Sequence, residues 1–453
     1  MVTDADRPLS VSHRRRAMRC AYWNGAVWAI GNGLASTTLV IYLAMELGAQ
    51  QIGLGIGMIL ATRYVVGLLR LGAPAVIGRW VDRKRFCLGC FLLATLVLLS
   101  LPLVAAPGRL PSAEASLAAL IVLWCAYHVL QYLGMVALWS WLADLVPLRI
   151  RGRFLGRRER WMVAGTAVGA LTCGLFTWWW KDTFPRPQWW IGYAIPTALG
   201  GCYMIASLLP LARIPRLATS PTVRFGATLD SMLAPFSDRR FQRLLFFGCW
   251  FSFANGLTQS AQYSYPYQIL AAEIVVFAML AMQTGMRLGQ FTVSPFLGRL
   301  ADRAGNRPVM MGSLLLVAQG PLFYFFATPA QPWWLVGAWT VWIAYAGLNV
   351  CLPNLMLKLS PEGSNTPYIA TYFAVTGLCY AVHTIVGGAL SDRYGESTFS
   401  FFGGVACDYY QLLFLAGWIA RSLGLIVLLV VIEGEGRNDE GGTSTKRFST
   451  SLR

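Results

Sequence analysis

Arginine residues stand inside three long apolar stretches of the chain, where a charged side chain is unfavourable. Arg63 lies in the stretch around Val65, and Arg287 lies 11 residues (298 − 287) before Gly298, where a charged loop begins. At about 1.5 Å per helical residue, this offset places Arg287 about 16 Å from the loop. Because a guanidinium group binds carboxylates and phosphates through paired hydrogen bonds, the sequence predicts that Arg63 or Arg287 binds an anionic group.

A structural role for these arginines is the alternative interpretation. Burying a charge in a membrane costs several kcal/mol, so an intramembrane arginine either serves a function, extends its head group to the surface, or pairs with backbone carbonyls. Arg70 and Arg421 fit the structural role best, and for Arg63 and Arg287 both interpretations stay open.

Polar and aromatic side chains recur at helical spacing in four of the apolar stretches. Asn24, Trp28, Asn32 and Ser36 are spaced by four and so share one helical face. Amide and aromatic groups suit a polar organic solute, whereas the alternative is hydrogen bonding between helices, which uses the same residue types. The residues predicted to line a central cavity are Asn24, Trp28, Asn32, His128, Gln131, Asn255, Gln259, Tyr263, Tyr345 and Asn349.

Two histidines are the candidates for carrying protons. His128 and His383 lie inside apolar stretches, and the pKa of a histidine can cross physiological pH. Each is equally explained as a buried structural histidine, so both interpretations stay open. The pair Cys87 and Cys90 lacks the two further ligands that a metal site needs, and we expect neither a metal nor a cofactor.

Membrane-spanning helices must position these residues. Hydrophobic residues make up 56% of the 453 positions and charged residues only 13%, about half the share in soluble domains. Uncharged runs of about 20 residues are long enough to cross a bilayer, and helices satisfy their own backbone there. We therefore predict an all-α integral membrane protein with twelve spans. Their centres lie near Gly33, Val65, Leu96, Leu130, Ala170, Gly200, Ser252, Gln283, Val317, Ala344, Thr376 and Gly424.

Basic residues fall almost entirely on one side of these predicted spans. Of the 37 Lys and Arg residues, the opposite side holds Arg109, Lys181, Arg186 and Arg393. The positive-inside rule then places both termini in the cytoplasm, and we expect a plasma (cytoplasmic, inner) membrane location. The net charge of +17 is explained by basic loops that meet anionic lipid, without nucleic acid.

The chain is divided into two related halves. Gly78-Arg79-Trp80-Val81-Asp82-Arg83 recurs as Gly298-Arg299-Leu300-Ala301-Asp302-Arg303, and each copy follows an apolar stretch. Asn32-Gly33-Leu34 likewise recurs as Asn255-Gly256-Leu257. The predicted parts are a basic N-terminal segment (1–19), a six-helix bundle (20–213), a central cytoplasmic loop (214–240), a second six-helix bundle (241–433) and a disordered cytoplasmic tail (434–453).

The repeated loops carry a resemblance to the major facilitator superfamily over nearly the full length. That family's loop reads G-x-x-x-D-R-x-G-R-R/K. The second copy has Gly298, Asp302, Arg303, Gly305 and Arg307, whereas the first keeps Gly78, Asp82 and Arg83 and has Arg85 in place of the second glycine. The resemblance implies a secondary transporter that works by alternating access, in which Asp82 holds the cytoplasmic end of span eleven and Asp302 that of span five.

A third stretch, Gly388 to Arg393, looks like the same loop but falls on the opposite side, and we interpret it as an ordinary helix end. Two other functions compete with transport of a small polar, anionic organic solute. One is a non-transporting sensor or receptor with the same fold. The other is a membrane-embedded lipid-modifying enzyme, which would need a histidine and a carboxylate in a surface loop. We expect no enzymatic activity, no obligate protein partner and a functional monomer, with solute and membrane lipid as partners.

Overall fold

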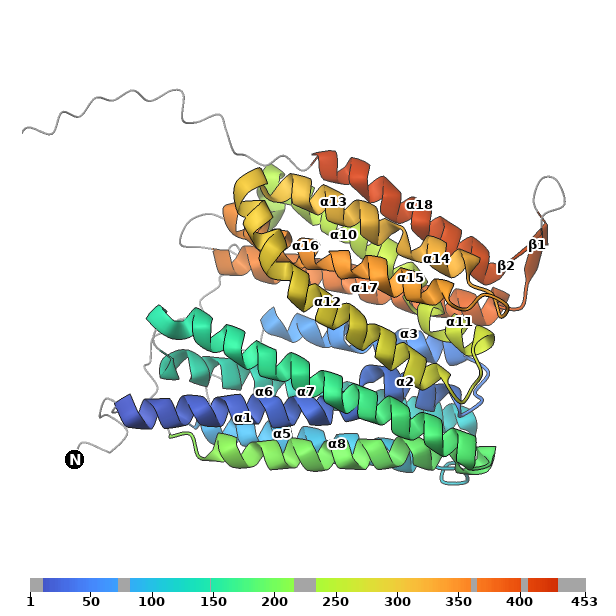
Figure 1. The fold of residues 1–453 in the computed structure, drawn as a ribbon, viewed down its shortest axis with the longest axis horizontal. Helices are drawn as coiled ribbons and strands as arrows, with labels where there is room; N and C mark the ends of the chain where they lie inside the picture. Colours follow the sequence, from blue (N-terminus) through green and yellow to red (C-terminus); the bar gives the residue numbers. More distant parts are fainter. Residues whose placement is uncertain are drawn as a thin grey trace, which may run out of the picture.

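Helices form most of the computed structural model, which describes residues 11–71, 82–146, 148–215, 234–359, 365–400 and 406–430 (Figure 1). The first half of the chain contains α1 (Val11–Leu34), α2 (Thr37–Met45), α3 (Ile52–Gly67), η2 (Leu68–Leu71), α5 (Arg83–Ala105), α6 (Ala113–Leu145), α7 (Leu148–Thr183), η3 (Arg186–Gln188) and α8 (Trp189–Ala212). The second half contains α10 (Arg239–Gln259), α11 (Ala261–Ile269), α12 (Val275–Ala304), α13 (Asn306–Ala318), α14 (Gly320–Phe326), α15 (Trp334–Val341), η4 (Trp342–Ala344), α16 (Tyr345–Leu359), α17 (Asn365–Tyr394) and α18 (Tyr409–Val430).

A short antiparallel hairpin joins α17 to α18. Its strands are β1 (Thr398–Ser400) and β2 (Ala406–Asp408), with Phe399 opposite Cys407. In Figure 1 this hairpin lies at the right-hand end of the molecule, and α1 begins and α18 ends at the left. We call these two ends the hairpin end and the tail end.

Apolar side chains on the outside of the helices identify a membrane protein. Leu93, Val122 and Ile426 are 53%, 67% and 59% exposed, which water would disfavour and lipid accepts. Within the described residues, nine helical segments are long and apolar enough to span a bilayer. All twelve predicted centres lie in helices, so the all-helical membrane fold is confirmed and the helix order is consistent with twelve spans.

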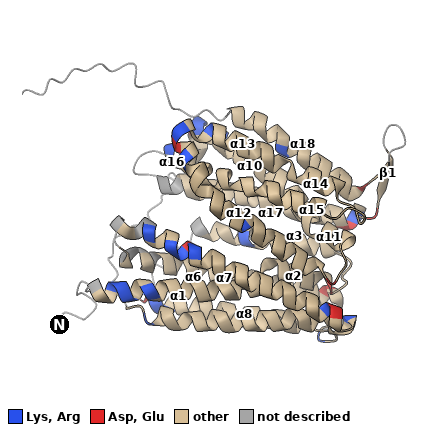
Figure 2. Cartoon of the chain, in the orientation of Figure 1, with Lys and Arg blue, Asp and Glu red and all other residues tan. Residues whose placement is uncertain are grey.

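The two halves of the chain lie one above the other in Figure 1, with α3 against α17 and α12 against α7 where they meet. Basic residues gather at the tail end and are sparse at the hairpin end (Figure 2). This distribution follows the charge asymmetry in the sequence. The sidedness that we derived from it, with the tail end in the cytoplasm, stays a prediction.

The first and the seventh predicted spans are interrupted at equivalent places. Helix α1 ends at Leu34, and the hydroxyl of Ser36 accepts a hydrogen bond from the backbone N–H of Leu39 to start α2. Helix α10 ends at Gln259, and α11 begins at Ala261. Each half of the chain thus has a break within its first long helical stretch.

Candidate functional site

Most of the predicted binding residues meet at a cavity of about 670 Å³ between the halves. Side chains from both halves line this cavity, including Trp28, Asn32, Arg63, His128, Gln259, Tyr263, Arg287 and Asn349. An adjoining cavity of about 490 Å³ shares Arg63, Gln259, Tyr263, Arg287 and Asn349 and adds Asn255 and Tyr345. All ten of these predicted residues thus line one or both cavities, and their binding role stays a prediction.

Positive charge dominates both cavities. Arg63 and Arg287 line both, and each side chain is solvent-accessible there. Nη2 of Arg63 donates to the hydroxyl of Tyr64 at 2.8 Å, and its guanidinium lies 4.8 Å from the Tyr64 ring centroid. Among the described residues that line either cavity, Glu159 is the single carboxylate. The arginines are thus left available to an anion from outside the protein.

Polar residues in the second cavity already bond to one another. The hydroxyl of Tyr345 donates to Oδ1 of Asn255, and Nδ2 of Asn255 donates to the carbonyl of Phe251 at 2.7 Å. The hydroxyl of Tyr263 accepts from Nε2 of Gln283 at 3.3 Å. These bonds fix the orientation of the amide and phenol groups, which is how a site achieves specificity for a polar solute.

Three predicted residues lie away from both cavities. Asn24 is buried and its amide donates to the carbonyl of Ser207 at 3.0 Å, between α1 and α8. Nε2 of Gln131 donates to the hydroxyl of Tyr127 at 3.3 Å. His383 bonds through Nδ1 to the carbonyl oxygen of Cys379 at 2.7 Å, within its own helix, and packs edge-on against Phe253. For these residues the structure shows contacts within and between helices, which was the alternative interpretation.

The second signature loop has the conformation that its glycine requires. Gly305 separates α12 from α13 with φ +89°, a backbone region that favours glycine. Arg307 donates from Nη2 to the carbonyl of Leu429 at 3.1 Å, which ties this loop to α18. Gly298, Asp302 and Arg303 belong to the last turns of α12. Asp302 is exposed and has no hydrogen-bond or ion-pair partner in the described part of the chain.

The first signature loop is described only from its aspartate onward. Gly78 lies outside the described residues. Asp82 caps its own helix α5 by accepting from the backbone N–H of Arg85 at 3.1 Å, and it pairs with the Arg85 side chain at 3.3 Å. Arg83 is the first residue of α5. The predicted partner of Asp82, the start of α17, has its first side chains outside the described set.

An aspartate cap joins the halves at the hairpin end instead. Oδ1 and Oδ2 of Asp392, near the end of α17, accept from the backbone N–H groups of Gly53 and Leu54 at 2.6 and 2.7 Å. These are the first-turn donors of α3, where Gln51 makes no side-chain cap. The interpretation of Gly388–Arg393 as an ordinary helix end is therefore incomplete, because its aspartate caps a helix of the other half.

Glycines make that contact close. A Cβ on Gly53 would lie 2.5 Å from the carbonyl oxygen of Gly388, and one on Gly388 would overlap the carbonyl of Gly53. A Cβ on Gly57 would lie 2.8 Å from the carbonyl oxygen of Thr384. Helices α3 and α17 thus meet backbone to backbone.

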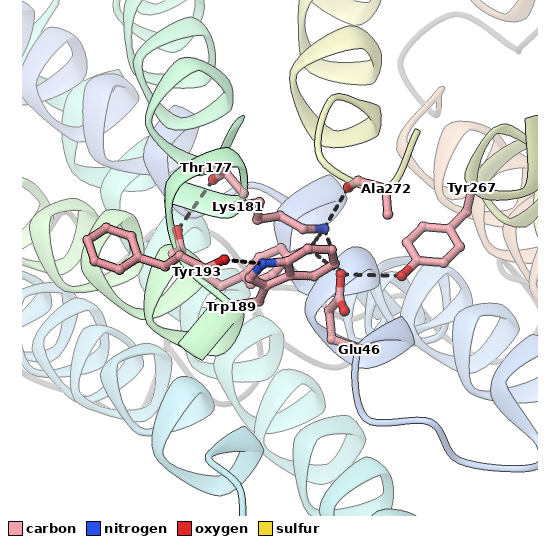
Figure 3. A network of polar contacts seen from close by, with 9 residues as sticks. Glu46, Thr177, Lys181, Trp189, Tyr193, Tyr267 and Ala272 are labelled. Atoms are coloured by element: carbon pink, nitrogen blue, oxygen red, sulfur yellow. Dashed lines mark hydrogen bonds and ion pairs between the residues drawn. The ribbon is translucent and has the colours of Figure 1, made fainter. Parts of the chain in front are cut away.

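A buried lysine forms a second contact between the halves at the hairpin end (Figure 3). Lys181 of α7 is 2% exposed, and its Nζ lies 2.7 Å from Oε1 of Glu46 and 2.7 Å from the carbonyl oxygen of Ala272. The hydroxyls of Tyr193 and Tyr267 donate to the same Glu46 oxygen at 3.1 and 3.4 Å. Because Tyr267 and Ala272 belong to the second half, this network holds the halves together. We refer to the Asp392 contact and the Lys181 network as the hairpin-end seam.

Sequence reasoning missed the residues of this seam. Lys181 was counted only as a basic residue on the side that is poor in charge, and Glu46, 135 positions away, was not connected with it. The available signal for this ion pair was that a basic and an acidic residue both lie on the side of the membrane that is poor in charge. For Asp392, the signal was the match of Gly388, Asp392, Arg393 and Gly395 to the spacing of the repeated loops.

Comparisons with known proteins agree with this architecture. The nucleoside transporter NupG aligns with a TM-score of 0.66 at 14% identity over 93% of this chain and 99% of that chain. A D-xylose-proton symporter aligns with a TM-score of 0.67 at 12% identity over 92% of this chain and 97% of that chain. A bacterial homologue of the human lysosomal transporter Spinster, in an inward-facing and unoccupied conformation, gives 0.59 at 13% identity, over 93% and 95% of the two chains.

Sequence comparison gives the family directly. The tetracycline resistance protein, class H, of Pasteurella multocida is 29% identical over 164 residues, which are 36% of this chain and 40% of that protein. The match thus spans less than half of this relative. The profile of the Major Facilitator Superfamily matches residues 22–372, more than three quarters of the sequence. The chain therefore belongs to the Major Facilitator Superfamily of membrane transporters.

Proposed function

We propose that this protein is a secondary transporter that moves a small, polar, anionic organic solute by alternating access. The observation that carries the proposal is that Arg63 and Arg287, from the two halves of the chain, line the same cavities with Glu159 as the single described lining carboxylate. A solute held between them would contact both halves at once. Such a contact couples binding to movement of the halves, which is how transporters built from repeats work.

The names of similar proteins indicate solutes of other kinds, and the proposed anion must be compared with these solutes. These names indicate a nucleoside, D-xylose with a proton, and resistance to tetracycline. Nucleosides and pentoses are neutral and would leave both guanidinium groups without a counter-charge. A cavity of about 670 Å³ admits a metabolite of that size, so charge rather than volume selects the anion.

The conformation supports an orientation open toward the tail end. The seam closes the hairpin end through Asp392 and Lys181. The cavity lining extends along α7 and α12 toward the tail end, through Glu159, Met162 and Ser294. With the tail end in the cytoplasm, as the positive-inside rule predicts, this is an inward-facing state. In the opposite state, Asp82 and Asp302 would engage the ends of α17 and α7, as the family resemblance implies.

Proton coupling, if it operates, would fall to His128. Its ring lines the larger cavity beside Arg63, with edge-on contacts to Trp124 and Tyr127 at 4.5 and 5.1 Å between ring centroids. His383 has its Nδ1 occupied within α17 and lies away from both cavities. Replacing His128 with Gln should therefore abolish any proton-driven accumulation, whereas the same change at His383 should leave it intact.

Uptake into proteoliposomes tests the proposal. Purified protein should accumulate labelled organic anions in preference to nucleosides and pentoses, saturably and without ohmic current. Arg63→Gln and Arg287→Gln should each raise KM or abolish uptake, whereas Arg109→Gln, a change at an exposed loop residue outside both cavities, should behave as wild type. Equal uptake of an anionic substrate by wild type and both cavity variants would overturn the proposal. Solute binding without uptake would favour a sensor.

A further inference from the structure

Arg421, in the middle of α18, is a buried cation whose hydrogen bonds are incomplete. The residue is 1% exposed, and its Nη2 donates to the hydroxyl of Thr258 at 3.0 Å. Its Nε and Nη1 have no partner within the described part of the chain. An arginine remains charged at all physiological pH values, so it cannot relieve this situation by losing a proton. The guanidinium therefore needs an acceptor that the surrounding side chains do not supply.

The surroundings of Arg421 are aromatic rather than acidic. Its guanidinium carbon lies 5.8 Å from the centroid of the Trp342 ring, which partly compensates the charge. Arg421 lines the smaller cavity together with Trp342, Tyr345 and Asn255. No Asp or Glu lines that cavity among the described residues, since Glu159 belongs to the larger one. A structural arginine is normally paired with a carboxylate or a set of carbonyls, and neither is present here.

Arg421 differs in position from the other two cavity arginines. Arg63 and Arg287 line both cavities, whereas Arg421 lines the smaller one alone, on the side of α18. A solute that extends from the shared region into the smaller cavity would therefore meet a second cationic group. The aromatic rings of Trp342, Tyr345 and Phe251 along this path suit a flat or apolar connecting body.

We propose that Arg421 binds an acidic group of the transported solute, so that the site selects organic dianions, with one acidic group at Arg63 or Arg287 and the other at Arg421. This proposal rests on the proposed transport of an organic anion. It assigns to Arg421 the role of a specificity residue that favours solutes with two carboxylates or phosphates over those with one. The unpartnered nitrogens are the donors that the second acidic group occupies.

Ligand-induced thermal stabilisation of the purified full-length protein tests this selectivity. The probes are benzoate and the three benzenedicarboxylate isomers, compared at equal ionic strength, because together they vary the number and spacing of acidic groups on one flat body. In wild type, at least one dicarboxylate should stabilise at a concentration tenfold or more below that needed for benzoate. In Arg421→Met this preference should disappear, while benzoate still stabilises.

Two further measurements separate binding from a structural role. Without ligand, Arg421→Met should unfold at the same or a higher temperature than wild type, because the variant removes an incompletely bonded charge. Arg421→Lys keeps a cation and should retain part of the dicarboxylate preference. A structural arginine predicts the reverse, with lower ligand-free stability and an unchanged preference.

The outcomes distinguish the two proposals. An unchanged dicarboxylate preference in both Arg421 variants, or equal responses of wild type to benzoate and the dicarboxylates, would overturn the role of Arg421 and leave the anion transporter standing. The role of Arg421 would likewise be overturned, and the anion transporter would stand, if Arg63→Gln abolishes every response to the ligands while Arg421→Lys changes none of them. Absence of any response in wild type to all four organic anions would count against both proposals.

Discussion

The two ends of this transporter use similar residues in different ways. At the hairpin end, Asp392 accepts two backbone hydrogen bonds from α3, and Lys181 is buried among groups of both halves. At the tail end, Asp302 is exposed and without a described partner. An aspartate near the end of a long helix thus joins the halves at one end of the molecule, and an aspartate at the matching place at the other end has no described partner. We expect the aspartate that is engaged to mark the end that is closed.

The largest effect on this asymmetry is expected from Lys181→Gln. The change leaves Glu46 in the seam without its cation, and breaking a buried ion pair in this way costs about 3 kcal/mol, or about a hundredfold in the balance between closed and open hairpin ends. Distances between spin labels placed at the exposed positions Asp182 and Thr398, in a cysteine-depleted background, should lengthen.

The matched control for this prediction removes both charges. In Glu46→Gln with Lys181→Gln no unpaired charge remains, so the hairpin end should open less than in the single variant. An identical label distance in wild type and Lys181→Gln would show that the Lys181 network does not hold the seam.

Gly388→Ala should open the hairpin end by a smaller amount. The added methyl group overlaps the carbonyl of Gly53, and overpacking of this kind costs about 1–3 kcal/mol. Gly377→Ala, on the same helix, places its Cβ 3.7 Å from the nearest atom and should leave both distance and uptake unchanged. Equal behaviour of the two variants would mean that the contact between α3 and α17 is not close in the working protein.

Asp392→Asn should have a more modest effect. The carboxylate is at the exposed hairpin end, where a charge beside a helix N-terminus contributes about 0.3–1 kcal/mol. In the variant, the same spin labels should show a minor population with an open hairpin end. At every ionic strength compared, this population should be smaller in the wild type than in the variant. Glu396→Gln, a nearby exposed acid, is the control and should match wild type.

Asp302→Asn should change this conformation least, because the side chain has no described partner to lose. Label distances at the hairpin end should stay within error of wild type. Uptake should nevertheless slow, since the opposite state would lack its latch at the tail end. Normal uptake by both Asp302→Asn and Asp82→Asn would contradict the latch and leave the hairpin-end seam unaffected.

The sequence predicted those features that depend on local spacing. Apolar runs located the helices, and a period of four placed Trp28 and Asn32 on the face that lines the cavity. The same period also selected Asn24, which instead bonds to Ser207 on α8. Residue spacing defines one face of a helix, but it does not tell which neighbouring helix covers each part of that face. How far a cavity extends along the helix therefore cannot be predicted from the spacing.

Features that depend on contacts between distant segments were not predictable in this way. Glu46 meets Lys181 only because α2, α7 and α8 converge at the hairpin end. Arg421 was assigned a structural role because its neighbours were unknown, and its partial bonding becomes visible only when α10 and α18 are packed together. The repeated loops did identify the architecture, because each loop motif is a short, continuous piece of sequence that can be recognised without knowing any long-range contact.

The backbone contact between Gly53 and Gly388 has a kinetic consequence. Side chains at an interface can change rotamer one at a time and so let it loosen gradually. Two apposed peptide backbones have no such internal adjustment, so Gly53 and Gly388 separate only when the helices that carry them move. Opening of this end should therefore be a single, concerted event. Trajectories of individual molecules would then show abrupt jumps between two distances, without a population at intermediate values.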